Sequence, residues 1–194
     1  MKKTTFITLA LLALAAPLTA GELQIELDPE LTSISFRLQA TLHSVHGSAA
    51  LTVGSLGLNT ENGSMTGAVT IDATTADTGN KKRDKKMHGK VLLTADHPEI
   101  VLQPDRLEGE LAQQGASDVT LHGAIEILGQ SHVVSVPMHI EIDDGHFTAN
   151  FEFEIPYVEW GLEDPSTFVL RVAKVVEITI EATGMIVAAA ETSP

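Results

Sequence analysis

Apolar and polar residues alternate along most of this chain. In the segment 147–155, for example, Phe, Ala and Ile occupy every second position, with Thr, Asn and Glu between them. Successive side chains of a strand point to opposite faces of a sheet, so each such segment is typical of a half-buried strand. The pattern predicts strands at 33–40, 64–71, 119–127, 134–142, 147–155 and 176–183, with weaker strands at 23–27, 48–58 and 99–103.

Turn residues separate these segments. Asn62-Gly63 and Asp144-Gly145 suit tight hairpins, and Gly129-Gln130 is a weaker turn signal. Strands joined by short turns form an antiparallel meander, and long amphipathic strands without covering helices bury their apolar faces when the sheet closes. The pattern therefore predicts an all-β fold, an antiparallel eight-stranded barrel. Two segments break the alternation: 78–93 is expected to form a short helix, and 156–174 a loop with a helical turn.

The aromatic content indicates which way the apolar faces point. A membrane barrel turns its apolar residues towards lipid and carries aromatic girdles at both interfaces, whereas this chain has one Tyr and one Trp. We therefore expect the apolar faces to point inwards, with no stable membrane insertion. The interior of an eight-stranded barrel is filled by side chains or holds one small ligand. Small inward residues such as Gly67, Gly123 and Ala149 either leave room for a ligand or accommodate taper and sharp bends, and both interpretations stay open.

The first twenty residues are predicted to form a secretory signal peptide. Lys2 and Lys3 precede an apolar run at 6–16, and Pro17 and small residues follow it. The run is too short to span a bilayer, which needs ~20 apolar residues. We therefore expect a periplasmic or secreted protein with a signal peptide at 1–20, a barrel domain at 21–187 and a disordered tail at 188–194.

Composition and charge exclude several kinds of site. The chain has no cysteine, so disulfides, thiolate metal ligands and cysteine nucleophiles are impossible. Without Lys2 and Lys3, ten basic residues remain against 26 acidic ones, and this net charge of −16 disfavours nucleic acid as a partner. Five of the basic residues nevertheless lie between Lys81 and Lys86, and such a positive stretch attracts phosphates, anionic lipid heads or acidic surfaces.

Motifs for catalysis or cofactor binding are missing from the sequence. It contains no Gly-x-Ser-x-Gly elbow, no phosphate-cradling loop, no dinucleotide fingerprint and no His-Glu-x-x-His helix. His43 and His46 are three residues apart, so on a continuous strand they point in opposite directions. We therefore expect no catalytic residues, no metal site and no cofactor. An enzyme that uses His43 or His88 as acid and base, on a lipid-like or small apolar substrate, is kept as an alternative.

From Leu27 to Val187 the chain resembles the YceI-like family, exported bacterial proteins often described as polyisoprenoid-binding. The resemblance is most specific at 42–47 and 78–88, where Arg83-Asp84 matches the family's hallmark pair. The residues after this pair are more basic than is common in the family. The resemblance implies a lipocalin-like antiparallel barrel that holds an elongated isoprenoid or other amphipathic lipid. Shorter matching elements are 97–100, 121–125, 160–162 and 165–168.

The barrel and the resemblance together predict two sets of site residues. Inward apolar side chains, with aromatic residues of the 156–174 loop, are expected to line a cavity for the lipid tail. Basic and imidazole groups at the mouth are head-group candidates because they bind phosphate, although a solvated helix surface or a structural role is an alternative. The cavity set is Phe36, Leu38, Val69, Ile71, Leu121, Val136, Met138, Phe151, Phe153, Trp160 and Phe168; the head-group set is Lys82, Arg83, Lys86, His43 and His88.

The predicted function is therefore a binding protein that transports, stores or sequesters one isoprenoid or other apolar lipid. An interaction module that docks its Lys81–Lys90 face on an anionic membrane or on another protein is a second alternative. Pairing of two barrels into a homodimer is left open.

Overall fold

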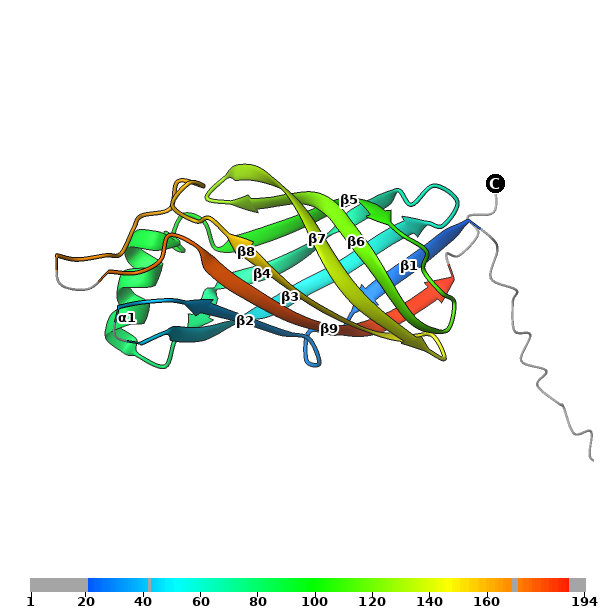
Figure 1. Cartoon of the computed structure of the whole chain (residues 1–194), viewed down its shortest axis with the longest axis horizontal. Coiled ribbons are helices and arrows are strands. Elements are labelled where there is room, and N and C mark those ends of the chain that lie inside the picture. Colours follow the sequence, from blue (N-terminus) through cyan, green and yellow to red (C-terminus); the bar gives the residue numbers. More distant parts are fainter. Residues whose placement is uncertain (1–20, 42, 169–170, 189–194) are drawn as a thin grey trace, which may run out of the picture.

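The computed structural model describes residues 21–41, 43–168 and 171–188, and these residues form one nine-stranded antiparallel sheet. A short helical segment lies at one end of the sheet, opposite the end at which β1 begins and β9 finishes (Figure 1). The strands are β1 (Glu22–Leu27), β2 (Ser33–Leu38), β3 (Val45–Asn59), β4 (Met65–Asp77), β5 (Glu99–Glu108), β6 (Gly115–Ile127), β7 (Gln130–Asp143), β8 (His146–Ile155) and β9 (Val176–Ala188); the helical elements are α1 (Lys81–Lys86) and the π-helical turn η1 (Met87–Val91).

The sheet closes on itself, so the nine strands form an eight-stranded barrel. β1 and β2 both lie between β3 and β9: β1 pairs with the C-terminal part of each, and β2 with the N-terminal part of each. They therefore occupy one interrupted strand position. The interruption is a turn at 28–32 in which the Asp28 carboxylate accepts the Glu30 N–H at 2.8 Å, while the Asp28 N–H donates to the Thr183 carbonyl at 2.8 Å.

The predicted all-β barrel is confirmed, and most strands run beyond their predicted ends. The helix expected at 78–93 is present as α1 and η1. The segment 156–174 contains a hydrogen-bonded turn, in which the Trp160 N–H donates to the Pro156 carbonyl at 3.1 Å, and no assigned helix in its described part. The predicted signal peptide and the tail after Ala188 lie outside the described residues. No helix in the described part of the chain is long and apolar enough to cross a bilayer.

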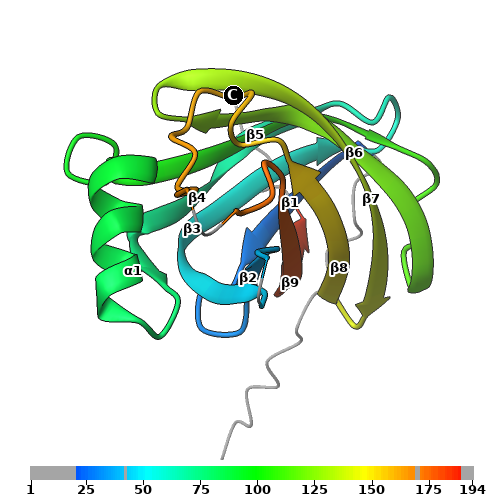
Figure 2. The same cartoon turned by 60° about the vertical axis from the view of Figure 1, so that its left-hand side comes forward.

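Buried side chains form two clusters along the barrel axis. The larger cluster occupies the half near the chain termini and includes Leu58, Met65 and Ile142. The smaller cluster fills the opposite end, where Tyr157 and Leu162 of the loop after β8 pack on Ile125 and Ile127 of β6. We call this end, which also carries α1, the helical end (Figure 2). The apolar faces therefore point inwards, as the aromatic content indicated.

Glycines inside the barrel wall permit close backbone contact. A Cβ atom added at Gly123 would lie 2.4 Å from the Gln103 carbonyl oxygen and 2.7 Å from the Pro104 Cα of the neighbouring strand β5. Gly67 has a φ of +93°, and a Cβ atom added there would lie 2.2 Å from the backbone carbonyl oxygen of Ser55. These two glycines serve tight strand packing and bending rather than extra internal volume.

Candidate functional site

An apolar cavity of about 100 Å³ lies inside the barrel, within the larger cluster. Its walls come from every strand position of the barrel, and Thr32 is the one polar residue among those that line it. Two of the small inward residues, Ala149 and Ala182, face this space and are themselves buried. The cavity therefore offers dispersion contacts and no charge, which suits a hydrocarbon group.

The structure brings together one part of the predicted cavity set. Val69, Ile71, Leu121, Met138 and Phe151 line the cavity. Residues that were not named as site residues line it as well, although the same alternation that identified the inward faces includes several of them. These additional residues include Ile25, Leu51, Leu56, Leu107, Ile140, Phe147, Ala149 and Ile180.

The other predicted cavity residues lie elsewhere. Val136 is buried in the wall, and Leu38 and Phe153 pack against the smaller cluster. The Phe36 ring lies close over Gly47, because a Cβ added there would be 2.2 Å from the Phe36 Cζ. Those that do not line the cavity are Phe36, Leu38, Val136, Phe153, Trp160 and Phe168.

Two of these residues, Trp160 and Phe168, come from the loop after β8. This loop has no alternating pattern that would indicate which of its side chains point inwards. The Trp160 ring stacks on His132 of β7, with ring centroids 4.3 Å apart and planes 3° from parallel. Phe168 is 98% exposed, so its inclusion in the cavity set was wrong. The loop therefore covers the helical end and does not supply a wall of the cavity.

A second, larger space lies on the outer face of the barrel. This outer cleft has a volume of about 910 Å³ and crosses the outward faces of strands β5 to β9. Its ionisable lining consists of four carboxylates and one imidazole, from Glu108, Asp118, Glu152, Glu181 and His139.

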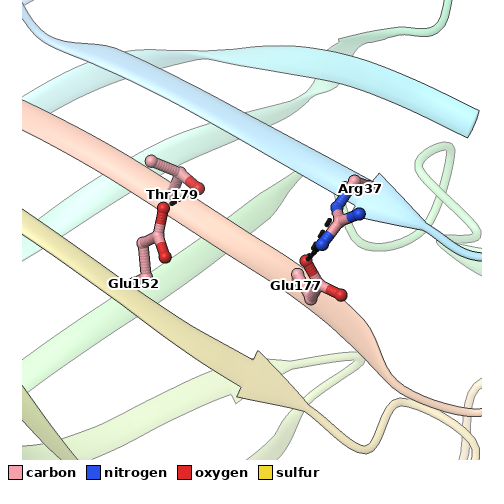
Figure 3. Close-up of polar contacts among 4 residues, drawn as sticks. All are labelled: Arg37, Glu152, Glu177 and Thr179. Atoms are coloured by element: carbon pink, nitrogen blue, oxygen red, sulfur yellow. Dashed lines mark hydrogen bonds and ion pairs between the residues drawn. The ribbon is translucent and has the colours of Figure 1, made fainter.

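Cross-strand contacts hold the polar side chains of this outer face. His139 Nδ1 lies 2.8 Å from the Asp118 carboxylate, and Thr179 of β9 donates to Glu152 of β8 at 3.4 Å. Beyond the cleft, Arg37 of β2 forms an ion pair with Glu177 of β9, with its Nε 2.8 Å from the carboxylate (Figure 3). Such pairs stabilise neighbouring strands by roughly 0.2–1 kcal/mol each.

The hallmark pair Arg83-Asp84 holds the start of the helical segment. Asn80 caps α1 by accepting the N–H groups of Lys82 and Arg83. The Arg83 guanidinium donates to the Thr78 hydroxyl at 2.7 Å and to the Thr78 carbonyl at 2.8 Å. The Asp84 carboxylate accepts the Thr78 N–H at 3.0 Å and also its hydroxyl. These hydrogen bonds lower the pKa of Asp84, and they favour the structural alternative for the pair.

Two more head-group candidates have partners inside the molecule. Lys86 donates to the Pro165 carbonyl at 2.7 Å and so ties α1 to the loop after β8. His88 Nε2 lies 2.8 Å from the Ala76 carbonyl, and its Nδ1 lies 3.3 Å from the Thr94 hydroxyl. Lys82 and His43 are exposed. Phosphate binding by this set stays a prediction, and none of its members lines the cavity or the outer cleft.

Comparisons with known proteins agree with the barrel. A model of the YceI-like domain matches residues 26–184, and a comparison with curated protein sequences gave no match. Three solved structures are similar: a polyisoprenoid binding domain from Saccharophagus degradans implicated in plant cell wall breakdown (16% identity, TM-score 0.64, 83% of this chain and 97% of that one), Burkholderia cenocepacia BcnA (14%, 0.62, 81% and 98%) and Campylobacter jejuni YCEI protein (13%, 0.53, 71% and 79%).

A closed eight-stranded barrel with an apolar cavity is the architecture of proteins that enclose one small ligand, as lipocalins do. The family match covers most of the chain, so the chain belongs to the YceI-like family. At these sequence identities the likeness to the three solved structures shows the fold alone.

Proposed function

We propose that this protein is an exported binding protein that holds the tail of an isoprenoid or other amphipathic lipid inside its barrel. The observation that carries the proposal is the internal cavity, whose lining is apolar except for Thr32. Burying apolar surface of a ligand there contributes roughly 25 cal/mol per Å². The described polyisoprenoid binding by the similar domain from Saccharophagus degradans supports the same class of ligand.

The volume of the cavity limits how the ligand fits. Typical ligand pockets are about 300–1,000 Å³, and this cavity is about 100 Å³. A long tail therefore displaces side chains when it binds. Met138 and Phe151 are only partly buried and border the cavity, and an unbranched thioether side chain such as that of Met138 adapts readily to new neighbours.

The predicted signal peptide at 1–20 supports export to the periplasm or out of the cell as part of this proposal. Native mass spectrometry of protein purified from its own host tests the function. We expect one lipid per chain, and added all-trans-farnesol should load protein that has been stripped of lipid. Protein that carries no lipid and ignores added farnesol would contradict the proposal.

A matched pair of variants links that result to the cavity. Ala149→Leu adds bulk at a buried position that lines the cavity, whereas Thr148→Leu places the same side chain at the neighbouring outward position. We expect Ala149→Leu to weaken farnesol binding at least tenfold and Thr148→Leu to bind normally. Equal binding by the two variants would place the ligand elsewhere.

A second candidate function is docking of the helical segment on an anionic membrane. Lys81, Lys82, Lys85 and Lys90 are exposed, and within the described residues no hydrogen bond or ion pair is found for their side chains. Juxtamembrane lysines each contribute roughly 1 kcal/mol of attraction to anionic lipid. Binding to vesicles that contain phosphatidylserine, lost when the four lysines become Gln, is the expected result; binding that persists rejects the candidate.

A further inference from the structure

The barrel wall is unpaired on one side, between β7 and β8. The two strands leave their hairpin with five paired positions, which end at His139↔Asn150. Within the described residues no pairing joins them beyond this point, although β7 continues its pairing with β6 to Gln130 and β8 continues with β9 to Ile155. Figures 1 and 2 show the two strands separating from the hairpin towards the helical end.

The far end of this gap is covered. Trp160 stacks on His132, and the side chain of Gln130 lies near Gly161, 3.5 Å from a Cβ added there. Between these contacts and the last paired residues, β7 is unpaired with β8 from 133 to 138, and β8 is unpaired with β7 from 151 to 155. We call this unpaired stretch the lateral opening.

Features of β7 keep this edge from closing. Val133 is 89% exposed on the outer side, and Pro137 lacks the N–H that a ladder hydrogen bond needs. Proline within a sheet is found on edge strands, at the first residue of a strand or at bulges, and it protects an edge from pairing with another chain. Pro137 thus favours a stable opening.

The cavity and the outer cleft lie on opposite sides of the barrel wall next to the lateral opening. Three residues line both spaces: Met138 of β7, Phe151 of β8 and Ile180 of β9. At these residues the wall of the barrel alone separates the interior from the outer face. Met138 and Phe151 follow directly after the last paired residues of β7 and β8, and both side chains are only partly buried.

We propose that the apolar tail of the ligand enters and leaves the barrel sideways, through the lateral opening, and that its polar head stays in the outer cleft. This inference rests on the proposed function. The helical end is filled by Tyr157, Leu162 and their neighbours, whereas β7 and β8 are unpaired beside residues that line both the cavity and the outer cleft.

The charge beside the opening selects the head group. The lining of the outer cleft includes four carboxylates and no lysine or arginine. Two of the carboxylates have basic or imidazole partners, Glu108 with Arg106 and His122, and Asp118 with His139. Within the described part of the chain the other two accept only from hydroxyl groups, Glu152 from Thr179 and Glu181 from Ser33. A neutral or cationic head is compatible with this lining, whereas a phosphate head is repelled.

Cysteine cross-links test the route directly, because the chain has no native cysteine. The pair Ser135→Cys and Glu154→Cys lies at exposed outward positions past the last paired residues of β7 and β8, and neither residue lines the cavity or the outer cleft. We expect the reduced protein to take up all-trans-farnesol, and oxidation or a short bismaleimide to slow uptake at least tenfold. Reducing the disulfide should restore the rate.

Two further pairs serve as controls. Glu141→Cys with Thr148→Cys bridges the same strands where they are already paired, and Ala40→Cys with Val172→Cys fixes the loop at the helical end. Neither cross-link should change uptake. Unchanged uptake through a cross-linked lateral opening, or uptake stopped by the cross-link at the helical end, overturns the lateral route alone. Reduced protein that binds no farnesol overturns the proposed function and the route together.

A single substitution tests the same barrier without a cross-link. Phe151→Ala removes the partly buried ring of a residue that lines both the cavity and the outer cleft. We expect farnesol to associate several-fold faster with this variant than with the original chain in stopped-flow measurements. An unchanged or slower association rate contradicts a gate at Phe151.

Discussion

The helical end and the lateral opening differ in how completely their polar groups are hydrogen-bonded and their apolar side chains are buried. At the helical end, Arg83, Asp84 and Thr78 satisfy one another, and buried apolar side chains fill the barrel. At the lateral opening two strand edges are unpaired and Met138 and Phe151 are partly exposed. Satisfied groups stabilise a structure, whereas sites that bind and release ligands are drawn from its less stable parts. The most recognisable stretch of this sequence therefore makes structural contacts, and the proposed binding site lies in plainer strands.

The largest expected effect is at the helical end. Leu162 is 5% exposed and packs in the smaller cluster, so Leu162→Ala should lower the free energy of unfolding by roughly 2–5 kcal/mol. Because Leu162 borders neither the cavity nor the outer cleft, the association rate of farnesol should not change. Urea unfolding of this variant measures the stability, and stopped-flow binding measures the association rate of farnesol. A changed association rate without a loss of stability would mean that the helical end, and not the lateral opening, controls entry of the ligand.

The network around Thr78 should show a smaller effect of the same kind. Thr78→Val keeps the shape of the side chain and removes the hydroxyl that joins Arg83 to Asp84, which should cost about 1–3 kcal/mol. Lys82→Ala, an exposed neighbour, should stay within about 0.5 kcal/mol. The hydrogen bonds that lower the pKa of Asp84 stabilise the folded state above the ordinary carboxyl pKa. That stabilisation is lost as the pH falls through the lowered value, so the difference between Thr78→Val and the original chain should shrink in acid.

The charge contrast between the two regions predicts a head-group preference. Farnesylamine, farnesol and farnesyl diphosphate carry the same tail with a cationic, neutral and anionic head. We expect the diphosphate to bind at least tenfold more weakly than the amine, equivalent to about 1.4 kcal/mol, and the difference to shrink at high salt. Titration calorimetry measures the three affinities. Tightest binding by the diphosphate would instead place the head near Lys82 and Arg83.

The smallest expected effect is that of Tyr157 ionisation on stability, because this ionisation does not change the free energy of unfolding at neutral pH. Burial, with a contribution from the Asp164 charge, raises the pKa of Tyr157 to about 12, and its hydroxyl donates to the Ala173 carbonyl at 2.9 Å. The phenol keeps its proton longer in the folded than in the unfolded state, so stability should fall between pH 10 and pH 12. Because the chain has one Tyr, tyrosinate absorbance reports this residue alone. Half-ionisation near pH 10 in folded protein would mean that the helical end is open to water.

The alternation of residues was sufficient to predict the barrel and the inward faces, but not the height of each side chain along the barrel axis. Met138 and Val136 lie two positions apart on the same face of β7, yet only Met138 borders the cavity. That difference depends on how neighbouring strands are staggered, which periodicity does not contain. Phe168 was placed wrongly because its loop has no period, and its apolar character alone does not bury it.

The lateral opening could not be predicted from alternation either, because β7 and β8 keep their period of two after they separate. One residue carried a usable signal. Pro137 interrupts an otherwise regular strand, and proline there indicates an open edge. The hallmark pair, in contrast, was useful for recognising the family, and only the contacts of Thr78 show what the pair does.

The most direct test is to map where a bound lipid lies. A farnesol analogue with a diazirine on its tail, photolysed on the protein and followed by peptide mass spectrometry, labels the side chains that it touches. We expect labelling of Met138, Phe151 and Ile180, abolished by excess unlabelled farnesol. Labelling confined to residues 81–93 would contradict a tail inside the barrel and a route between β7 and β8.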